Sequence, residues 1–170
     1  KELVYDDISL FSRQISTIKS RFSQDIKLTN NIQFGKKMID VGILMSAPML
    51  DVSGEELCSF LGSQNHVGVL HRFMSAEDQL KSIKKIIESK APIISFSIGI
   101  HDSKEKLDIL KGFLKGTEGL SLLICIDTAN GASELLEKPI KAIKDFAAEL
   151  LEHDVEIMAG NIVTREAAQW

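Results

Sequence analysis

Short, continuous apolar runs recur along the chain, and each ends at or just before a polar residue. The runs cover residues 42–46, 66–70, 92–96, 122–126 and 155–159, and the residues that mark their ends are Ser46, His71, Ser97, Asp127 and Asn161. Strands that are buried on both faces require continuous apolarity, and parallel sheets covered by helices contain such strands. The pattern therefore predicts five parallel strands.

Helix signals lie between these runs. Ser53 with Glu56 and Ser75 with Asp78 have the spacing of a capping box. Apolar faces with helical spacing are formed by Leu80, Ile83, Ile86 and Ile87, by Leu107, Leu110 and Leu114, and by Ile140, Ile143, Ala147, Leu150 and Leu151. Pro139 suits the first turn of the fourth helix, and Thr164 could cap a fifth. These faces are expected to pack on the sheet.

The spacing of the strand ends favours one architecture. The ends are 25, 26, 30 and 34 residues apart, which suits strand-loop-helix units. A (β/α)8 TIM barrel consists of such units and carries its chemistry on the loops after the strands. We therefore predict an α/β fold over residues 41–170: the N-terminal half of a TIM barrel, with four β/α units, a fifth strand and the start of a fifth helix, and with the helices outside. The chain stops at Trp170, so three units are expected to be missing.

Residues 1–40 show no clear period and contain the turn formers Asn30, Asn31 and Gly35. We expect an extended N-terminal arm there, with one short strand pair.

Composition limits the classes of partner. The 170 residues are 44% hydrophobic with a formal net charge of −4, which predicts a soluble body of about one domain without a global cationic field. The one candidate basic patch is Lys19 to Arg21, so neither nucleic acid nor a membrane is an expected partner. No apolar run approaches the roughly 20 residues that span a bilayer, and the acidic start does not resemble a signal peptide. A cytoplasmic location is expected.

Two cysteines, Cys58 and Cys125, are too few and too far apart to indicate a disulfide framework or a metal site. Cys58 lies in a helical pattern and Cys125 inside an apolar run. Because a reactive thiolate needs exposure and positive surroundings, both are expected to be small buried hydrophobes.

The polar residues at the strand ends are the candidate site. Asp127 could simply cap its loop and Asn161 could simply end a strand, and for either residue alone this interpretation is about as good as a functional one. Residues 46–49 and His71-Arg72 follow other strands, and the carboxyl ends of barrel strands share one face. The set together therefore favours a binding site.

Several segments resemble a known family in order and spacing. They are residues 6–10 (DDISL), 16–21 (STIKSR), 71–75 (HRFMS), 127–131 (DTANG) and 159–164 (AGNIVT). These segments are similar to those of the IMP dehydrogenase and GMP reductase family over nearly the whole chain. The resemblance implies a (β/α)8 barrel that binds a purine nucleotide and a nicotinamide cofactor at its mouth and uses a cysteine nucleophile on the loop after the sixth strand.

Within the family, the chain looks more like a GMP reductase, which converts GMP to IMP and ammonia with NADPH. The regulatory insert of most IMP dehydrogenases is absent between residues 79–83 and 92–94, and Asn130 stands where bacterial dehydrogenases tend to have His. An IMP dehydrogenase without the insert, using NAD, is the alternative, because the Ser-Ala-Pro-Met of residues 46–49 departs from the Ala-Asn-Met common in reductases.

The resemblance also implies roles for individual residues. Nucleotide contacts fall on Ser46, Ala47 and Met49, and cofactor contacts on Arg72, Ser97, Asp102, Asp127, Thr128, Ala129 and Asn161. The catalytic cysteine has no counterpart in the chain, because Cys125 lies below the mouth, two residues before Asp127. We therefore expect a complementary C-terminal half-barrel on a missing segment or a second chain, in a homo- or hetero-oligomer. A non-catalytic, nucleotide-binding half-barrel that acts as a regulator remains the other possibility.

Overall fold

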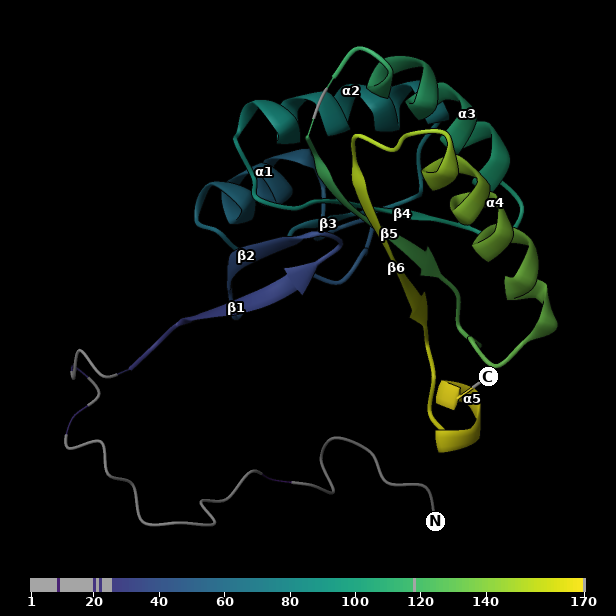
Figure 1. The fold of residues 1–170 in the computed structure, drawn as a ribbon. Helices are drawn as coiled ribbons and strands as arrows, with labels where there is room; N and C mark the ends of the chain where they lie inside the picture. Colours follow the sequence, from purple (N-terminus) through teal and green to yellow (C-terminus); the bar gives the residue numbers. More distant parts are fainter. Residues whose placement is uncertain (1–8, 10–19, 21, 23–25, 118, 170) are drawn as a thin grey trace.

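The computed structural model describes residues 9, 20, 22, 26–117 and 119–169 and has an α/β architecture. A parallel sheet lies beneath a layer of helices, and a separate strand pair lies on its other side (Figure 1). Most of the predicted arm lies outside the described residues, as do Lys19 and Arg21 of the predicted basic patch and most of segments 6–10 and 16–21.

The parallel sheet has four strands in the order β3 (Val69–Leu70), β4 (Ile94–Ile98), β5 (Ser121–Asp127) and β6 (Asp154–Gly160). The β4–β5 register pairs Ser97 with Cys125, and the β5–β6 register pairs Asp127 with Gly160. The carboxyl ends of β5 and β6 therefore lie side by side, as the strand pattern predicts. The described residues form an open sheet that matches part of a TIM barrel rather than a closed one.

The prediction of a first parallel strand over residues 42–46 is wrong. Only Met45 pairs with its neighbour, as an isolated parallel bridge to Val67, and Gly42 ends a strand of the hairpin described below. Ile43, Leu44 and Met45 are each more than half exposed. This segment is at the edge of the sheet, so a single neighbour has to supply its hydrogen bonds, and one bridge is all that forms.

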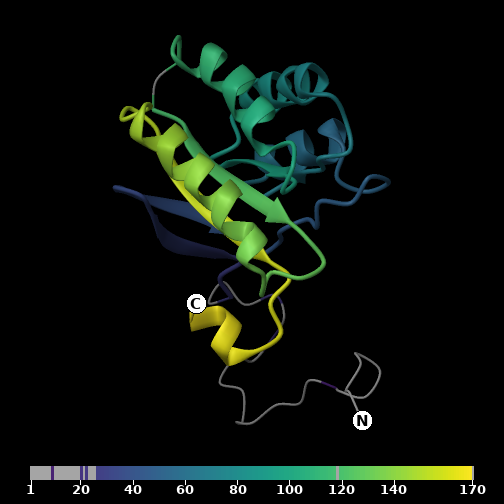
Figure 2. The same cartoon turned by 90° about the vertical axis from the view of Figure 1, so that its right-hand side faces the viewer.

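Four helices cover one face of the sheet: α1 (Glu55–Ser63), α2 (Ala76–Glu88), α3 (Ser103–Leu114) and α4 (Glu137–Ala148), which follows the 3-10 turn η2 (Glu134–Leu136). The short helix α5 (Arg165–Gln169) lies beyond the end of β6, apart from that layer (Figure 2). No helix in the described ranges combines the length and apolarity needed to cross a bilayer.

The helix starts follow the sequence signals with one exception. Ser75 caps α2, because its Oγ accepts a hydrogen bond of 3.1 Å from the amide of Asp78. Thr164 Oγ1 accepts one from the amide of Ala167 at the start of α5. Ser53, however, does not cap α1: Gly54 is the N-cap, and the buried Ser53 hydroxyl donates to the carbonyl of Ala47. A tertiary contact has taken the place of the expected cap.

The main core lies between the helices and the sheet. The buried members of the predicted faces include Ile83 and Ile86 of α2, Leu107, Leu110 and Leu114 of α3, and Ile143 of α4. Leu151 departs from the prediction and is 77% exposed. Helix α4 ends at Ala148, so helical spacing no longer places Leu151 on the buried face, whereas Leu150 stays in the core.

The strand pair expected near the arm is present as an antiparallel hairpin, β1 (Thr29–Phe34) and β2 (Lys37–Gly42). Its Phe34 and Val41 pack against the helix-free face of the sheet, in a cluster with Val67, Val69, Ile93 and Cys125. The hairpin turn is tied to the first residue of β6, since Asp154 accepts a hydrogen bond from the amide of Lys36 and pairs with the Lys37 ammonium at 3.3 Å. The hairpin thus lies at the amino ends of the strands, opposite the loops of the predicted site.

Candidate functional site

A pocket of about 400 Å³ lies at the carboxyl ends of the strands. Its lining comes from three separate segments, residues 45–48, 125–127 and 158–161. Four residues singled out from the sequence meet there: Ser46 and Ala47 on one side, Asp127 and Asn161 on the other. The fold therefore brings a predicted nucleotide contact and a predicted cofactor contact into one cavity.

The first loop is held by its own polar groups. The amide of Ser46 donates to Val67 O, and its Oγ accepts from the amide of Val69, both at 3.0 Å. The Ser53 hydroxyl holds the carbonyl of Ala47 from below. Ala47 is thereby exposed at the pocket wall, while Met49 is 56% exposed and lies outside the lining.

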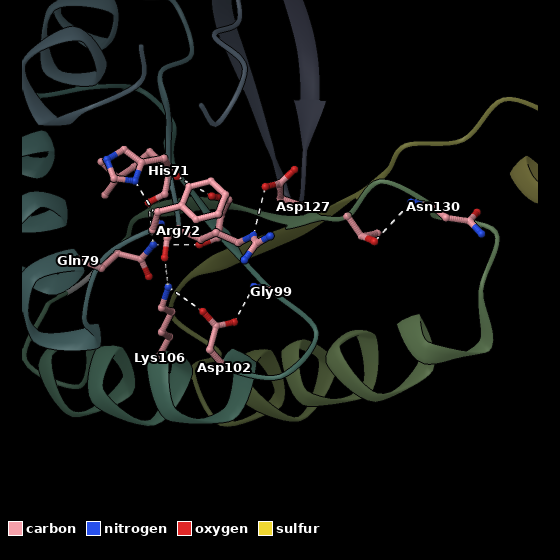
Figure 3. A network of polar contacts seen from close by, with 12 residues as sticks. His71, Arg72, Gln79, Gly99, Asp102, Lys106, Asp127 and Asn130 are labelled. Carbon is pink, nitrogen blue, oxygen red and sulfur yellow. Dashed lines mark hydrogen bonds and ion pairs between the residues drawn. The ribbon is translucent and has the colours of Figure 1, made fainter. Parts of the chain in front are cut away.

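Arg72 reaches across the mouth to Asp127. Its Nε lies 3.2 Å from Asp127 Oδ2, and the side chains of Arg72 and Asp127 are 31% and 28% exposed. The guanidinium also stacks over the ring of Phe73, 4.5 Å from the centroid. The pair joins the loop after β3 to the end of β5, so the two predicted cofactor residues are in direct contact (Figure 3).

Asp102 lies behind this pair and faces a lysine. Its Oδ2 is 2.8 Å from the ammonium of Lys106, and its Oδ1 accepts a hydrogen bond of 2.7 Å from the amide of Gly99 (Figure 3). Burial acts to raise the pKa of Asp102, but the hydrogen bonds from Lys106 and Gly99 outweigh it and hold that pKa below its ordinary value. Asp102 is therefore ionised, and both of its carboxylate oxygens have partners within the protein.

Ser97 and His71 are directed into the protein. Ser97 is fully buried, and its hydroxyl donates to Leu70 O on the neighbouring strand at 2.8 Å. His71 is 7% exposed and accepts a hydrogen bond at Nδ1 from the amide of Phe73. Burial, and then the charge of Lys106, lower the pKa of His71, whereas Asp51 opposes the shift. Neither side chain lines the pocket.

The loops after β5 and β6 are joined by backbone hydrogen bonds. Thr128 donates to Gly160 O, Asn161 donates to Thr128 O, and Gly131 donates to Asn161 O, over 3.1, 2.7 and 2.7 Å. A Cβ at Gly131 would lie 2.9 Å from Asn161 O, so glycine permits this close approach. Ala129 and Asn161 are exposed, and Thr128 is half-buried.

Both cysteines are buried, as the sequence predicts. Burial raises the pKa of Cys58 to about 12, although a hydrogen bond with Ser46 opposes it. Burial and the nearby charge of Asp127 raise the pKa of Cys125 to about 11. Both are therefore thiols at neutral pH, and neither is an activated nucleophile.

Sequence reasoning missed part of the network. Gln79 donates to the carbonyls of His71 and Ser97, and Lys106 donates to the carbonyl of Arg72. The spacing of four residues between Asp102 and Lys106 signals an ion pair on a helix, but it does not signal that the lysine is buried. Met45 and Met158 of the pocket lining appeared only as members of strands.

Comparison with known proteins places this site in context. Residues 2–170 match the family model described as the IMP dehydrogenase / GMP reductase domain. The chain is 31% identical over 165 residues to a GMP reductase of Lactobacillus gasseri, covering 97% of this chain and 45% of that protein. It is 25% identical over 205 residues to an inosine-5'-monophosphate dehydrogenase of Borreliella burgdorferi, covering 98% and 49%. The chain thus spans about half the length of the curated relatives it matches, and it belongs to the IMP dehydrogenase / GMP reductase family.

Proposed function

We propose that this chain forms the nucleotide- and dinucleotide-binding half of a GMP reductase-type active site, which converts GMP to IMP and ammonia with NADPH. The observation that carries the proposal is the pocket that joins residues 45–48 to Asp127 and Asn161. Two of its three walls contain parts of the segments that resemble the family, residues 127–131 and 159–164. The relatives named GMP reductase match nearly the whole chain.

The purine nucleotide would bind on the side of Ser46, Ala47 and Met49. Ala47 and Met49 expose small and flexible apolar surface that suits a flat heteroaromatic ring. The Ser46 hydroxyl is occupied by the amide of Val69, so it fixes the loop, and backbone groups of the loop are left to contact the nucleotide.

The nicotinamide cofactor would bind on the side of Asp127 and Asn161. The donor set fits this group: the carboxamide of Asn161 can pair with the nicotinamide carboxamide, and the carboxylate of Asp127 can accept from a ribose hydroxyl or an amide. Thr128 and Ala129 follow Asp127 along the chain and would extend this side beyond the pocket lining, and Arg72 would orient Asp127 through their ion pair. When bound, NADPH supplies the hydride.

Asp102 and Ser97 support this side from within the fold. Asp102 holds the amide of Gly99, which fixes the loop after β4, and Ser97 holds β4 to β3. Both can therefore shape the cofactor side through the fold, and the direct cofactor contacts that the family resemblance implies for them stay predictions.

The covalent step needs a cysteine thiolate, and the two thiols of this chain are both raised in pKa by burial. We propose that the nucleophile comes from a complementary C-terminal half-barrel, on a further segment or on a second chain. That half would also pair with the exposed edge at residues 43–45.

The test is a turnover assay with the complete protein, or with this chain mixed with the separately expressed C-terminal half of a GMP reductase. GMP-dependent loss of NADPH absorbance is the expected result, with NADPH preferred to NADH. IMP-dependent formation of NADH would instead establish a dehydrogenase. Nucleotide binding by calorimetry without turnover would point to a regulator, and absence of both binding and turnover would overturn the proposal.

The variants Asn161→Ala and Asp127→Asn sharpen this test. Both are expected to raise the KM for NADPH more than the KM for GMP, because their side chains lie on the cofactor side. The matched control is Asp145→Asn, which changes an exposed carboxylate on α4, away from the mouth. Unchanged kinetics in the two site variants would remove Asp127 and Asn161 from the cofactor site.

A further inference from the structure

Lys106 is a buried lysine on the first turns of α3. Its side chain is 4% exposed, and its ammonium lies 2.8 Å from Asp102 Oδ2 and 2.5 Å from the carbonyl of Arg72. A buried charge is costly unless it is paired and hydrogen-bonded, and both of these partners satisfy the ammonium. Its neighbour Lys104, on the same helix, is 83% exposed and pairs with the exposed Asp108.

The two bonds of Lys106 lead to two different loops of the mouth. Arg72 belongs to the loop after β3, and Asp102 belongs to the loop after β4. Asp102 carries the connection further, since its other oxygen accepts from the amide of Gly99. A single ammonium group therefore ties the two loops together, as Figure 3 shows.

Contacts at its backbone and along its side chain fix the position of Arg72. Its carbonyl is held by Lys106, while its Nε reaches Asp127 Oδ2 at 3.2 Å. The guanidinium passes close over Gly99, because a Cβ built there would lie 3.2 Å from Arg72 Nη1 and 2.8 Å from Asp102 Oδ1. Arg72 is thus held at its carbonyl by Lys106 and at its Nε by Asp127, and its guanidinium passes close to Gly99.

We propose that Lys106 is a positioning residue that sets the Arg72–Asp127 pair for the dinucleotide end of the site. This inference rests on the proposed function only for the identity of the ligand. Lys106 is not part of the pocket lining, so it acts through the backbone of Arg72 and the carboxylate of Asp102. Side chains that act at a site depend on such supporting contacts for their geometry.

The test compares Lys106→Met with the matched control Lys104→Met in the complete protein. The first readout needs no ligand: heteronuclear NMR measures how fast the Nε proton of Arg72 exchanges with water. With Lys106 removed, Arg72 is expected to leave Asp127 more often, and exchange should accelerate about tenfold. In Lys104→Met, the Nε proton of Arg72 should exchange with water at the wild-type rate. Wild-type exchange in Lys106→Met would overturn the proposal.

The second readout separates positioning from general stability. Lys106→Met is expected to weaken NADPH binding about tenfold or more, because a displaced contact group is costly, and to change GMP affinity by less than about twofold. Lys106→Arg, which keeps the charge and the donors, should recover part of the NADPH affinity. Equal losses for NADPH and GMP would assign Lys106 a purely structural role and overturn the proposal.

The test also covers a variant that does not fold and a wild-type protein that binds no ligand. If Lys106→Met does not fold, Lys106→Gln, which keeps a shorter neutral donor, is measured with the same readouts and the same criteria. If the wild-type protein binds neither NADPH nor GMP, the proposed function fails, and the Arg72 exchange rates alone decide whether Lys106 positions the Arg72–Asp127 pair.

Discussion

The two faces of the parallel sheet differ in composition and in cover. On the helix-covered face, Ile94, Phe96 and Ile98 of β4 and Leu122, Ile124 and Ile126 of β5 are each at most 2% exposed. The opposite face alternates with them and carries Ser95, Ser97, Leu123, Cys125 and Asp127, with the hairpin over its amino end alone. The difference teaches that one face is a continuous apolar core, whereas the other combines a smaller apolar cluster with buried serines and brings Asp127 to the mouth.

Neighbouring residues of β5 give the largest expected contrast. Ile124→Ala on the covered face should lower the free energy of unfolding by about 2–5 kcal/mol, because it leaves a cavity in a close-packed core. Leu123→Ala on the opposite face should cost only about 1 kcal/mol, because Leu123 is partly exposed already. Urea unfolding measures both, and equal losses would erase the distinction between the faces.

Substitutions at two glycines test whether the backbone hydrogen bonds between the loops after β5 and β6 require glycine at position 131. Gly131→Ala should lower the free energy of unfolding by about 1–3 kcal/mol, since its Cβ would meet Asn161 O and Ile162. The control, Gly112→Ala, lies in α3 with open space around it and should stabilise by about 0.5–1 kcal/mol. Thermal or urea unfolding of the two variants measures this. An unchanged free energy of unfolding in Gly131→Ala would show that the two loops can move apart enough to hold a Cβ.

Ser97 tests whether buried polar groups on the face opposite the helices hold the sheet together. Ser97→Ala should lower the free energy of unfolding by about 1 kcal/mol, because it removes the buried hydrogen bond to Leu70 O. NADPH affinity, measured by calorimetry, should stay close to the wild-type value. A large loss of affinity with unchanged stability would instead assign Ser97 to direct cofactor contact.

Acid titration gives the smallest expected effect. The pKa of Asp102 is lower in the folded chain than its ordinary 3.8, despite burial, because Lys106 and Gly99 favour the carboxylate. Its stabilisation is therefore present above that pH and is lost as the pH falls through the folded pKa. The difference in unfolding free energy between wild type and Asp102→Asn should shrink below pH 3.8. A difference that grows in acid would reverse the sign assigned to this group.

Periodicity alone predicted the covered face of the sheet. Continuous apolar runs located β4, β5 and β6, and helical spacing located the buried residues of α2 and α3, because burial imposes these periods directly on the sequence. The site positions at strand ends followed in the same way. Asp127 and Asn161 meet in one pocket because β5 and β6 are parallel and end at a common edge, and Ser46 reaches that pocket on a segment that forms a single bridge.

Features set by single tertiary contacts could not be predicted. Residues 43–45 have a strand composition but form one bridge, because pairing depends on neighbours that composition does not specify. Ser53 has the sequence of a cap, but its hydroxyl bonds to Ala47. Lys106 stands in a charged stretch that suggests a solvated helix face, and only the folded loops reveal that it is enclosed.

The backbone hydrogen bonds between the loops after β5 and β6 affect which substitutions this edge of the sheet can accept during evolution. They run between the backbones of Thr128, Gly131, Gly160 and Asn161, so the geometry is largely indifferent to the side chains at these positions, glycine 131 excepted. Substitutions at Thr128, Ala129 or Asn161 can therefore change the side chains presented at the carboxyl ends of the strands without moving the backbone. A lineage can vary the side chains at this edge of the sheet by small, independent steps.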